Sequence, residues 1–302
     1  MVIAAAGLWG MTGTAQSFAH PALASTWIGC LRLAVSAVFF GAWIAAFGPR
    51  GWKGRWPWRR TWLAAVCMTV YNLAFFAGVR NTGVAVGTAI AIGSGPVWAG
   101  VLQWIVRGQA PDRRWWAGTA IAVAGGALMI LGRGGAAHFA FDGFGIGACL
   151  LAGLSYATYA LVNKTLVAEV PAGTATGAVF GLAALMALPM AWALAGPPVI
   201  EGRDVVVVAW LGVMSTGVAY LLFSHALRHV SGPTGVALAL AEPCVAFGLA
   251  VAVVGERPGW LAFAGLLGVL VGLALVIRAE LAGTGGVSGA ARRGDGADAR
   301  AV

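Results

Sequence analysis

Apolar runs of about 20 residues constrain this chain more than any other feature, because a helix of that length spans the hydrocarbon core of a bilayer. Short separators containing proline, glycine and charged residues lie between the runs. The sequence therefore predicts an all-α integral membrane protein with about ten transmembrane helices. The expected spans lie near residues 1–17, 24–48, 61–79, 82–107, 115–132, 143–164, 173–196, 205–227, 233–255 and 259–278.

The composition indicates that lipid surrounds most of the folded chain. Of 302 residues, 60% are hydrophobic and only 10% are charged, whereas soluble domains carry about 25% charged residues. So few charges could not cover the surface of a protein of this size in water. The 46 glycines fit the same interpretation, because small residues let transmembrane helices approach closely.

The distribution of positive charge indicates orientation in a membrane rather than a nucleic-acid partner. The formal net charge is +9, but the cations lie at helix ends and in short loops and form no basic face with interleaved aromatic residues. With a cytoplasmic N-terminus, fourteen of the 19 lysines and arginines fall in inner loops and the tail, four fall in outer loops, and Arg32 lies within a span. We therefore predict a multi-pass inner-membrane protein with both termini cytoplasmic.

The two ends of the chain need separate interpretation. Small residues over 21–25 leave a cleaved signal peptide as an alternative for the first span. No lysine or arginine precedes Arg32, and we favour a retained helix. After Leu281 the chain consists of glycine, alanine, arginine and aspartate without apolar periodicity. We expect residues 282–302 to form a disordered cytoplasmic tail.

An internal repeat relates the two halves of the chain. Pro96, Gly118 and Gly125 match Pro243, Gly265 and Gly272, each at an offset of 147 residues. We therefore expect one five-helix repeat over residues 1–132 and a second over 143–278, which together form one transport domain. Five is an odd number, so the second copy must enter the membrane in the opposite orientation. Inverted repeats of this kind are typical of secondary transporters.

Several motifs resemble those of a known family. They are Leu8-Trp9-Gly10-Met11-Thr12-Gly13, Arg32, Ser94-Gly95-Pro96-Val97, Ala241-Glu242-Pro243 and Gly255-Glu256-Arg257. Together they resemble the EamA-type transporters of the drug/metabolite transporter superfamily over nearly the whole chain. The first copy departs from the usual Gly-Glu-Arg, having Gly108-Gln109-Ala110. The resemblance implies ten helices, cytoplasmic termini, and export of amino acids or other small metabolites from a bacterial cell.

Glu242 is the residue that we single out for function. It lies near the middle of the ninth span, where a carboxylate is costly unless it is protonated, paired or facing a water-filled cavity. It is therefore a candidate for binding substrate or taking up a proton. The alternative is a protonated acid that hydrogen-bonds across helices beside Pro243.

Arg32 and two prolines are further candidates. Arg32 either extends to the outer headgroups or faces the cavity and attracts a substrate carboxylate. Pro96 and Pro243 lie inside matching spans, where each removes a backbone hydrogen bond. They are either hinge or gate residues beside a cavity or kinks that serve packing.

The other candidates for lining a substrate cavity are uncharged polar and aromatic residues within spans. They are Trp9, Thr12, Gln16, Tyr71, Asn72, Tyr156, Tyr159, Ser215 and Tyr220. The first three are spaced to share one helix face. Each candidate either lines the cavity or joins neighbouring helices.

The sequence favours a secondary transporter that exports amino acids or other small metabolites by alternating access, either coupled to protons or running downhill. The alternative is a membrane-embedded enzyme acting on lipid or isoprenoid headgroups, which would need clustered carboxylates or histidines. Here the acids are mostly isolated. We expect no catalytic residues, cofactor or metal, and we expect a small-molecule substrate and the lipid bilayer as partners.

Overall fold

The computed structural model describes all residues except 17, 49–53, 132–141, 255–257 and 299–302. Throughout this part of the chain the regular structure is helical, without strands, as predicted. The elements are α1 (Val2–Gly10), α2 (Thr12–Gln16), α3 (Ser25–Phe47), α4 (Trp58–Thr82), α5 (Val84–Arg107), α6 (Arg113–Leu131), α7 (Gly143–Glu169), α8 (Ala172–Ala195), α9 (Gly202–Trp210), η2 (Leu211–Val218), α10 (Ala219–Ala226), α11 (Gly232–Leu238), η3 (Ala239–Ala241), α12 (Glu242–Leu249), η4 (Ala250–Val254) and α13 (Trp260–Asp298).

These elements form ten helical units, one at each predicted span. The first unit is α1–α2, the eighth is α9–η2–α10, and the ninth is α11–η3–α12–η4. Eight units are long and apolar enough to cross a membrane on their own. The other two are α1–α2, which is short, and α6, which begins with two arginines. The predicted ten-helix fold is thereby confirmed.

The eighth and ninth units are interrupted helices. In the eighth, a π-helical segment, η2, separates α9 from α10. In the ninth, the 3-10 turn η3 ends at Ala241, directly before Glu242 and Pro243. Pro96, by contrast, lies inside the continuous helix α5. The two matching prolines therefore differ in their local structure, since only the one in the second half follows a break in the α-helix.

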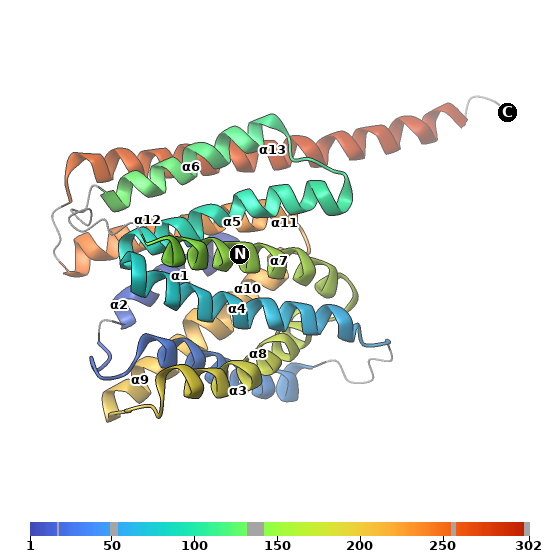
Figure 1. The fold of residues 1–302 in the computed structure, drawn as a ribbon. Helices are drawn as coiled ribbons and strands as arrows, with labels where there is room; N and C mark the ends of the chain where they lie inside the picture. The colour runs from blue at the N-terminus through green and yellow to red at the C-terminus, as the bar shows by residue number, and fades with distance from the viewer. Residues whose placement is uncertain (17, 49–53, 132–141, 255–257, 299–302) are drawn as a thin grey trace.

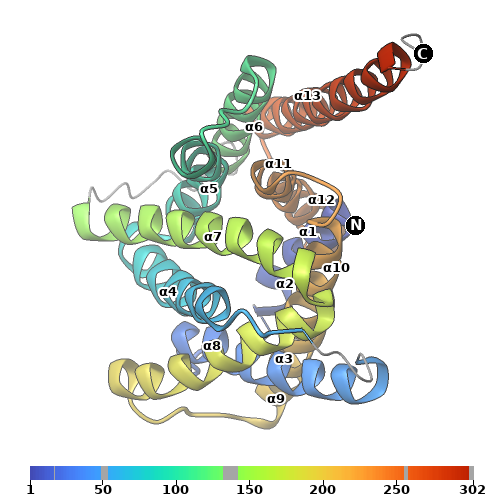
Figure 2. The same ribbon diagram turned by 90° about the vertical axis from the view of Figure 1, so that its right-hand side faces the viewer.

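Figure 2 shows the helices of the two halves interleaved in one bundle. Helices α6 and α13 lie at one end of this view and α3, α8 and α9 at the other, as in Figure 1. Helices α4, α5 and α7 lie on one side, opposite α1, α10, α11 and α12. The central residues described below come from both sides.

The contacts between helices repeat in a twofold pattern. Helix α3 packs against α8, and α6 against α13, so that units 2 and 5 meet their own counterparts, units 7 and 10. The packing of α4 on α7 is matched by that of α10 on α1, and the packing of α5 on α7 by that of α12 on α1. Each half of the chain therefore uses equivalent helices to contact the other half.

Close glycine contacts join α6 to α13. A Cβ atom at Gly118 would lie 2.8 Å from the carbonyl oxygen of Gly272, and one at Gly125 would lie 2.7 Å from that of Gly265. Gly118 and Gly125 match Gly265 and Gly272 in the sequence repeat, so this seam follows the same twofold relation. Only glycine at these positions lets the two backbones approach so closely.

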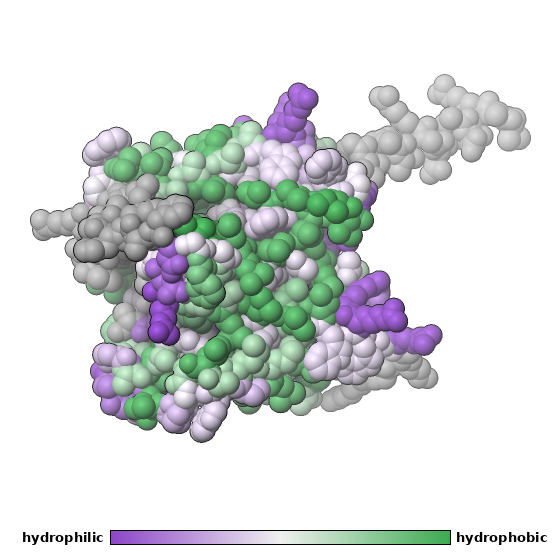
Figure 3. Space-filling model, viewed as in Figure 1, coloured by the Kyte–Doolittle hydropathy of each residue, from purple (hydrophilic) through white to green (hydrophobic). Residues whose placement is uncertain are grey.

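The bundle has a largely apolar face (Figure 3), and the last helix extends beyond the bundle (Figure 1). On the face drawn in Figure 3, apolar side chains cover the middle of the bundle, and most hydrophilic residues lie toward its edges. Helix α13 continues to Asp298 and projects away from the bundle (Figure 1), which differs from the disordered tail expected over 282–302. The chain has no proline after Pro258, so every residue of α13 can donate a backbone hydrogen bond.

Candidate functional site

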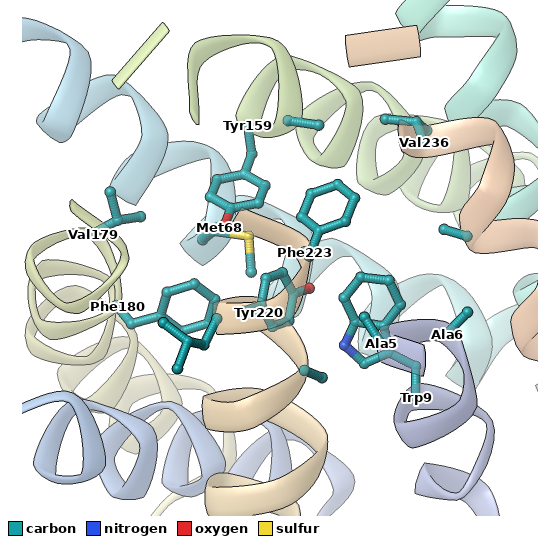
Figure 4. Packing of buried hydrophobic residues seen from close by; sticks show 14 of the residues in the cluster. Ala5, Ala6, Trp9, Met68, Tyr159, Val179, Phe180, Tyr220, Phe223 and Val236 are labelled. Atoms are coloured by element: carbon teal, nitrogen blue, oxygen red, sulfur yellow. The ribbon is translucent and has the colours of Figure 1, made fainter. Parts of the chain in front are cut away.

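An aromatic cage occupies the middle of the bundle, where helices of both halves meet. The ring centroid of Trp9 lies 5.0 Å from that of Tyr220 and 6.3 Å from that of Tyr156. Tyr71 joins the group through Tyr156, with centroids 5.5 Å apart. Figure 4 shows Trp9 and Tyr220 facing each other, with Phe223 close to both. These contacts bring side chains of α1, α4, α7 and α10 together.

Arg32 approaches this cage from α3. Its Nη2 donates a hydrogen bond to Oδ1 of Asn72 at 3.0 Å, and Nδ2 of Asn72 donates to the carbonyl oxygen of Met68. Asn72 thus fixes one side of the guanidinium group. The side chain of Arg32 points into the bundle rather than out to the headgroups, because its partner Asn72 is buried and its own Nε is buried as well.

Glu242 is the first residue of α12 and is half-buried. The acid lies near the cage, because α12 packs against α1, the helix that carries Trp9. Helix α1 packs directly on this point, since a Cβ atom at Gly10 would lie 2.8 Å from the carbonyl oxygen of Glu242. We call Trp9, Arg32, Tyr71, Asn72, Tyr156, Tyr220 and Glu242 the central cluster.

Three buried donors in the central cluster have no hydrogen-bond partner among the residues that the structure describes. They are Nε1 of Trp9, Nε of Arg32 and the hydroxyl of Tyr156. Buried polar groups are nearly always hydrogen-bonded, and an exception calls for a ligand, a water molecule or another specific explanation. The cluster combines three such exceptions with one carboxylate, so it can receive a small molecule that has both acceptor atoms and a cationic group.

The remaining predicted site residues lie around this cluster. Oγ1 of Thr12 and Oγ of Ser215 are 2.5 Å apart, which joins α2 to the π-helical segment η2. Tyr159 is fully buried and packs against Phe180 and Tyr220, while Nδ2 of Asn163 lies within hydrogen-bond distance of its hydroxyl. Gln16 is half-buried at the end of α2.

Sequence reasoning missed a buried polar network next to Tyr159. Nδ2 of Asn163 donates to Oγ of Ser224 at 2.9 Å, and Oγ1 of Thr176 contacts the same oxygen at 2.7 Å. All three residues are fully buried on α7, α8 and α10. The available signal was the presence of an asparagine, a serine and a threonine within apolar spans, but many such residues only join helices.

Polar contacts link the two halves at both edges of the bundle. At the edge predicted to be cytoplasmic, Arg60 of α4 forms an ion pair with Glu169 of α7. At the opposite edge, Nε2 of His20 lies 3.2 Å from Oε1 of Glu201, and the backbone N–H of His20 donates to Asp204 at 2.7 Å. The two edges therefore use the same kind of contact. At each edge, a residue at the end of the first helical unit of one repeat contacts a residue at the start of the third helical unit of the other repeat.

Within the described ranges, no three His, Cys, Asp or Glu side chains cluster closely enough to hold a metal ion. The four cysteines, at positions 30, 67, 149 and 244, are free thiols. The family-like motif at 255–257 lies outside the described residues.

Comparison with known proteins gives one family. The sequence profile described as the EamA-like transporter family matches residues 1–131 and 143–278, the two segments identified above as repeats. An "Uncharacterized transporter YwfM" of Bacillus subtilis (strain 168) is 36% identical over 276 residues, covering 89% of this chain and 91% of the relative. A solved structure described only as "Crystal structure of protein" has the same fold, with a TM-score of 0.79 and 18% identity over 92% of this chain and 96% of the other.

Proposed function

Because this chain belongs to the EamA-like transporter family, we propose that it exports amino acids or other small metabolites across the bacterial inner membrane as a secondary transporter. Membrane transport is the activity of the family and of the named relative. The observation that carries the finer proposal is the central cluster, which combines three unpartnered buried donors with one acid, Glu242.

The central cluster has the groups that an amino acid requires. Arg32 has an unused Nε–H, and a guanidinium binds a carboxylate through short, charge-assisted hydrogen bonds. Glu242 offers a carboxylate for an ammonium group. The faces of Trp9, Tyr156 and Tyr220 offer apolar contact and, for a cation, an attractive ring quadrupole. The cluster would therefore bind both charged ends of a zwitterion and accommodate its side chain.

Alternating access is supported by the twofold pattern of contacts. Two equivalent halves can exchange conformations about a fixed central site, which opens it to one side and then to the other. In this mechanism the Arg60–Glu169 contact closes one edge, and the His20–Glu201 contact closes the other. Each contact joins the two halves and would have to break when its own side opens.

Proton coupling would reside in the second half alone. Glu242 is matched in the first repeat by Gly95, so only one copy offers an acid at this depth. Glu242 also follows directly on η3, where the helix geometry changes. A carboxyl group at such a break can exchange protons with whichever side is open.

The test combines metabolite export with transport by purified protein. Metabolites that accumulate outside cells carrying the protein, but not outside cells lacking it, would be assayed by counterflow in liposomes. Arg32→Gln should reduce counterflow of carboxylate-bearing substrates by more than tenfold, since a hydrogen bond to a charged group contributes about 1.5–3 kcal/mol. Arg80→Gln, which removes an exposed arginine in the last turn of α4, outside the central cluster and both edge contacts, is the matched control. Undiminished counterflow in Arg32→Gln would contradict the proposed site.

A further inference from the structure

A cationic pocket of about 630 Å³ opens between the two halves at the edge predicted to be cytoplasmic. Its charged lining residues are Arg60, Arg107, Lys164, Glu169 and Arg228. Arg60 and Arg107 belong to α4 and α5 of the first half, whereas the other three belong to the second half. The pocket is separate from the central cluster, with which it shares no residue.

Two of the cations are fixed in place by backbone carbonyl groups. Nζ of Lys164 donates to the carbonyl oxygens of Leu227 and Val230, both at 2.7 Å. Nε and Nη2 of Arg228 donate to the carbonyl oxygens of Val167 and Val170, at 2.9 and 3.1 Å. An ammonium group has three donors and a guanidinium has five. Both groups are thus positioned and still have N–H donors to offer to a ligand.

The lining carries more positive charge than its own acid can neutralise. Four lining residues are cations, and the single lining acid, Glu169, is paired with Arg60. Glu280 also acts on Lys164 from outside the lining, but its carboxylate accepts hydrogen bonds from Ser231 and Thr234 at 2.6 Å. Among the described residues that line the pocket, Arg107 and Arg228 therefore have no acid beside them.

Membrane orientation alone does not account for this arrangement. The positive-inside tendency requires lysine and arginine near the cytoplasmic ends of helices, and scattered surface residues satisfy it. It does not require four cations from both halves to converge on one pocket, with two of them held by carbonyl groups. We propose that the cationic pocket is an anion-binding site that accepts a phosphate or carboxylate group.

The chemistry of the site fits an oxyanion with several acceptor atoms. Charge-assisted N–H bonds to phosphate or carboxylate oxygens are short and about twice as strong as neutral ones. The anion can come from the headgroup of an acidic lipid, as in other basic pockets between transmembrane helices, or from a free metabolite. The proposal goes beyond transport through the central cluster, because anion binding here does not depend on what the cluster carries.

The test uses the full-length protein in phosphatidylcholine nanodiscs, with inorganic phosphate as the probe. Phosphate is titrated at constant ionic strength, because salt screens exposed charges, and its apparent affinity is taken from the rise in the thermal unfolding midpoint. Arg107→Gln is the decisive variant, since Arg107 is exposed and its loss breaks no carbonyl contact. Arg80→Gln is the matched control, because Arg80 is likewise an exposed arginine in the last turn of its helix.

We expect Arg107→Gln to weaken phosphate binding by up to about fivefold, the range of one exposed charge pair, and Arg80→Gln to leave it unchanged. Nanodiscs containing phosphatidylglycerol then identify the source of the anion. Loss of the phosphate effect there assigns the site to a lipid headgroup, and its persistence assigns it to a free anion. The proposal is overturned if phosphate does not stabilise the protein in either nanodisc, or stabilises Arg107→Gln as much as the wild type. Counterflow plays no part in this readout, so failure here is distinct from failure of the proposed transport function.

Discussion

Substitution of alanine for Gly125 tests how closely α6 and α13 pack. The added Cβ atom would lie 2.5 Å from the backbone nitrogen of Val269 and 2.7 Å from the carbonyl oxygen of Gly265. Ordinary contacts begin near 3.4 Å, so the two helices must separate by about 0.7–0.9 Å. Overpacking of this kind costs about 1–3 kcal/mol. Because both obstructing atoms belong to the backbone, a change of side-chain rotamer cannot relieve the clash.

Gly126→Ala is the matched control for this prediction. A Cβ atom at Gly126 would meet no heavy atom within 4 Å, so this variant should gain up to about 1 kcal/mol from helix propensity alone. Both variants gain the same helix propensity, so the difference between their unfolding midpoints reports only the contact between α6 and α13. We expect Gly125→Ala to unfold about 2–6 °C below Gly126→Ala, at roughly 2 °C per kcal/mol.

The measurement is thermal unfolding of both variants in the same nanodiscs at one scan rate, because membrane proteins commonly unfold irreversibly. Equal midpoints for the two variants would refute the reasoning, since they would show that α6 and α13 tolerate a methyl group where their backbones approach closely. The twofold relation gives a second expected result. Gly272→Ala, whose Cβ atom would lie 2.5 Å from the carbonyl oxygen of Gly118, should be destabilised to a similar degree.

Three further predictions concern function and orientation. Glu242→Gln should still exchange substrate but lose accumulation driven by a pH gradient, in which each pH unit is worth about tenfold per proton; unchanged pH-driven uptake in liposomes would remove Glu242 from coupling. Arg60→Glu should slow transport by weakening closure at one edge, and the double variant Arg60→Glu/Glu169→Arg should restore the rate if the ion pair is what closes that edge; a double variant as slow as the single one would argue against this. A reporter active only in the cytoplasm should be active when fused after Leu281, and a periplasm-only reporter should be active in the 200–204 loop; the opposite pair of signals would contradict the predicted orientation.

The two halves are not equivalent in detail, although their contacts are. Pro96 lies in a continuous helix, whereas Pro243 follows a 3-10 turn. Gly95 and Glu242 occupy matching positions, and only the second can carry charge. The π-helical segment η2 lies in the same half, and such segments often accompany functional sites.

The sequence by itself determined the helices and their number. A run of about 20 apolar residues must form a helix in a bilayer, because the backbone can satisfy its hydrogen bonds in no other local way. This rule depends only on residues close together in the chain, and so each predicted span matches a helical unit. The sequence also indicated a repeat, since Pro96, Gly118 and Gly125 have counterparts at a constant offset. The sequence did not predict the interruptions η2 and η3, because residues of neighbouring helices decide where a helix changes its geometry.

The tertiary structure alone decided which polar residues meet. The sequence left open whether Arg32 reaches the headgroups or the interior, and its contact with Asn72, 40 residues away, decided for the interior. The same holds for the edge contacts, which join residues 109 and 184 positions apart. Hydropathy is a property of each residue, but an unpartnered donor is a property of everything packed around it. For that reason Trp9 and Tyr156 could be named as candidates from the sequence, while their unsatisfied hydrogen bonds, on which the proposed site rests, emerged only from the packing of helices from both halves.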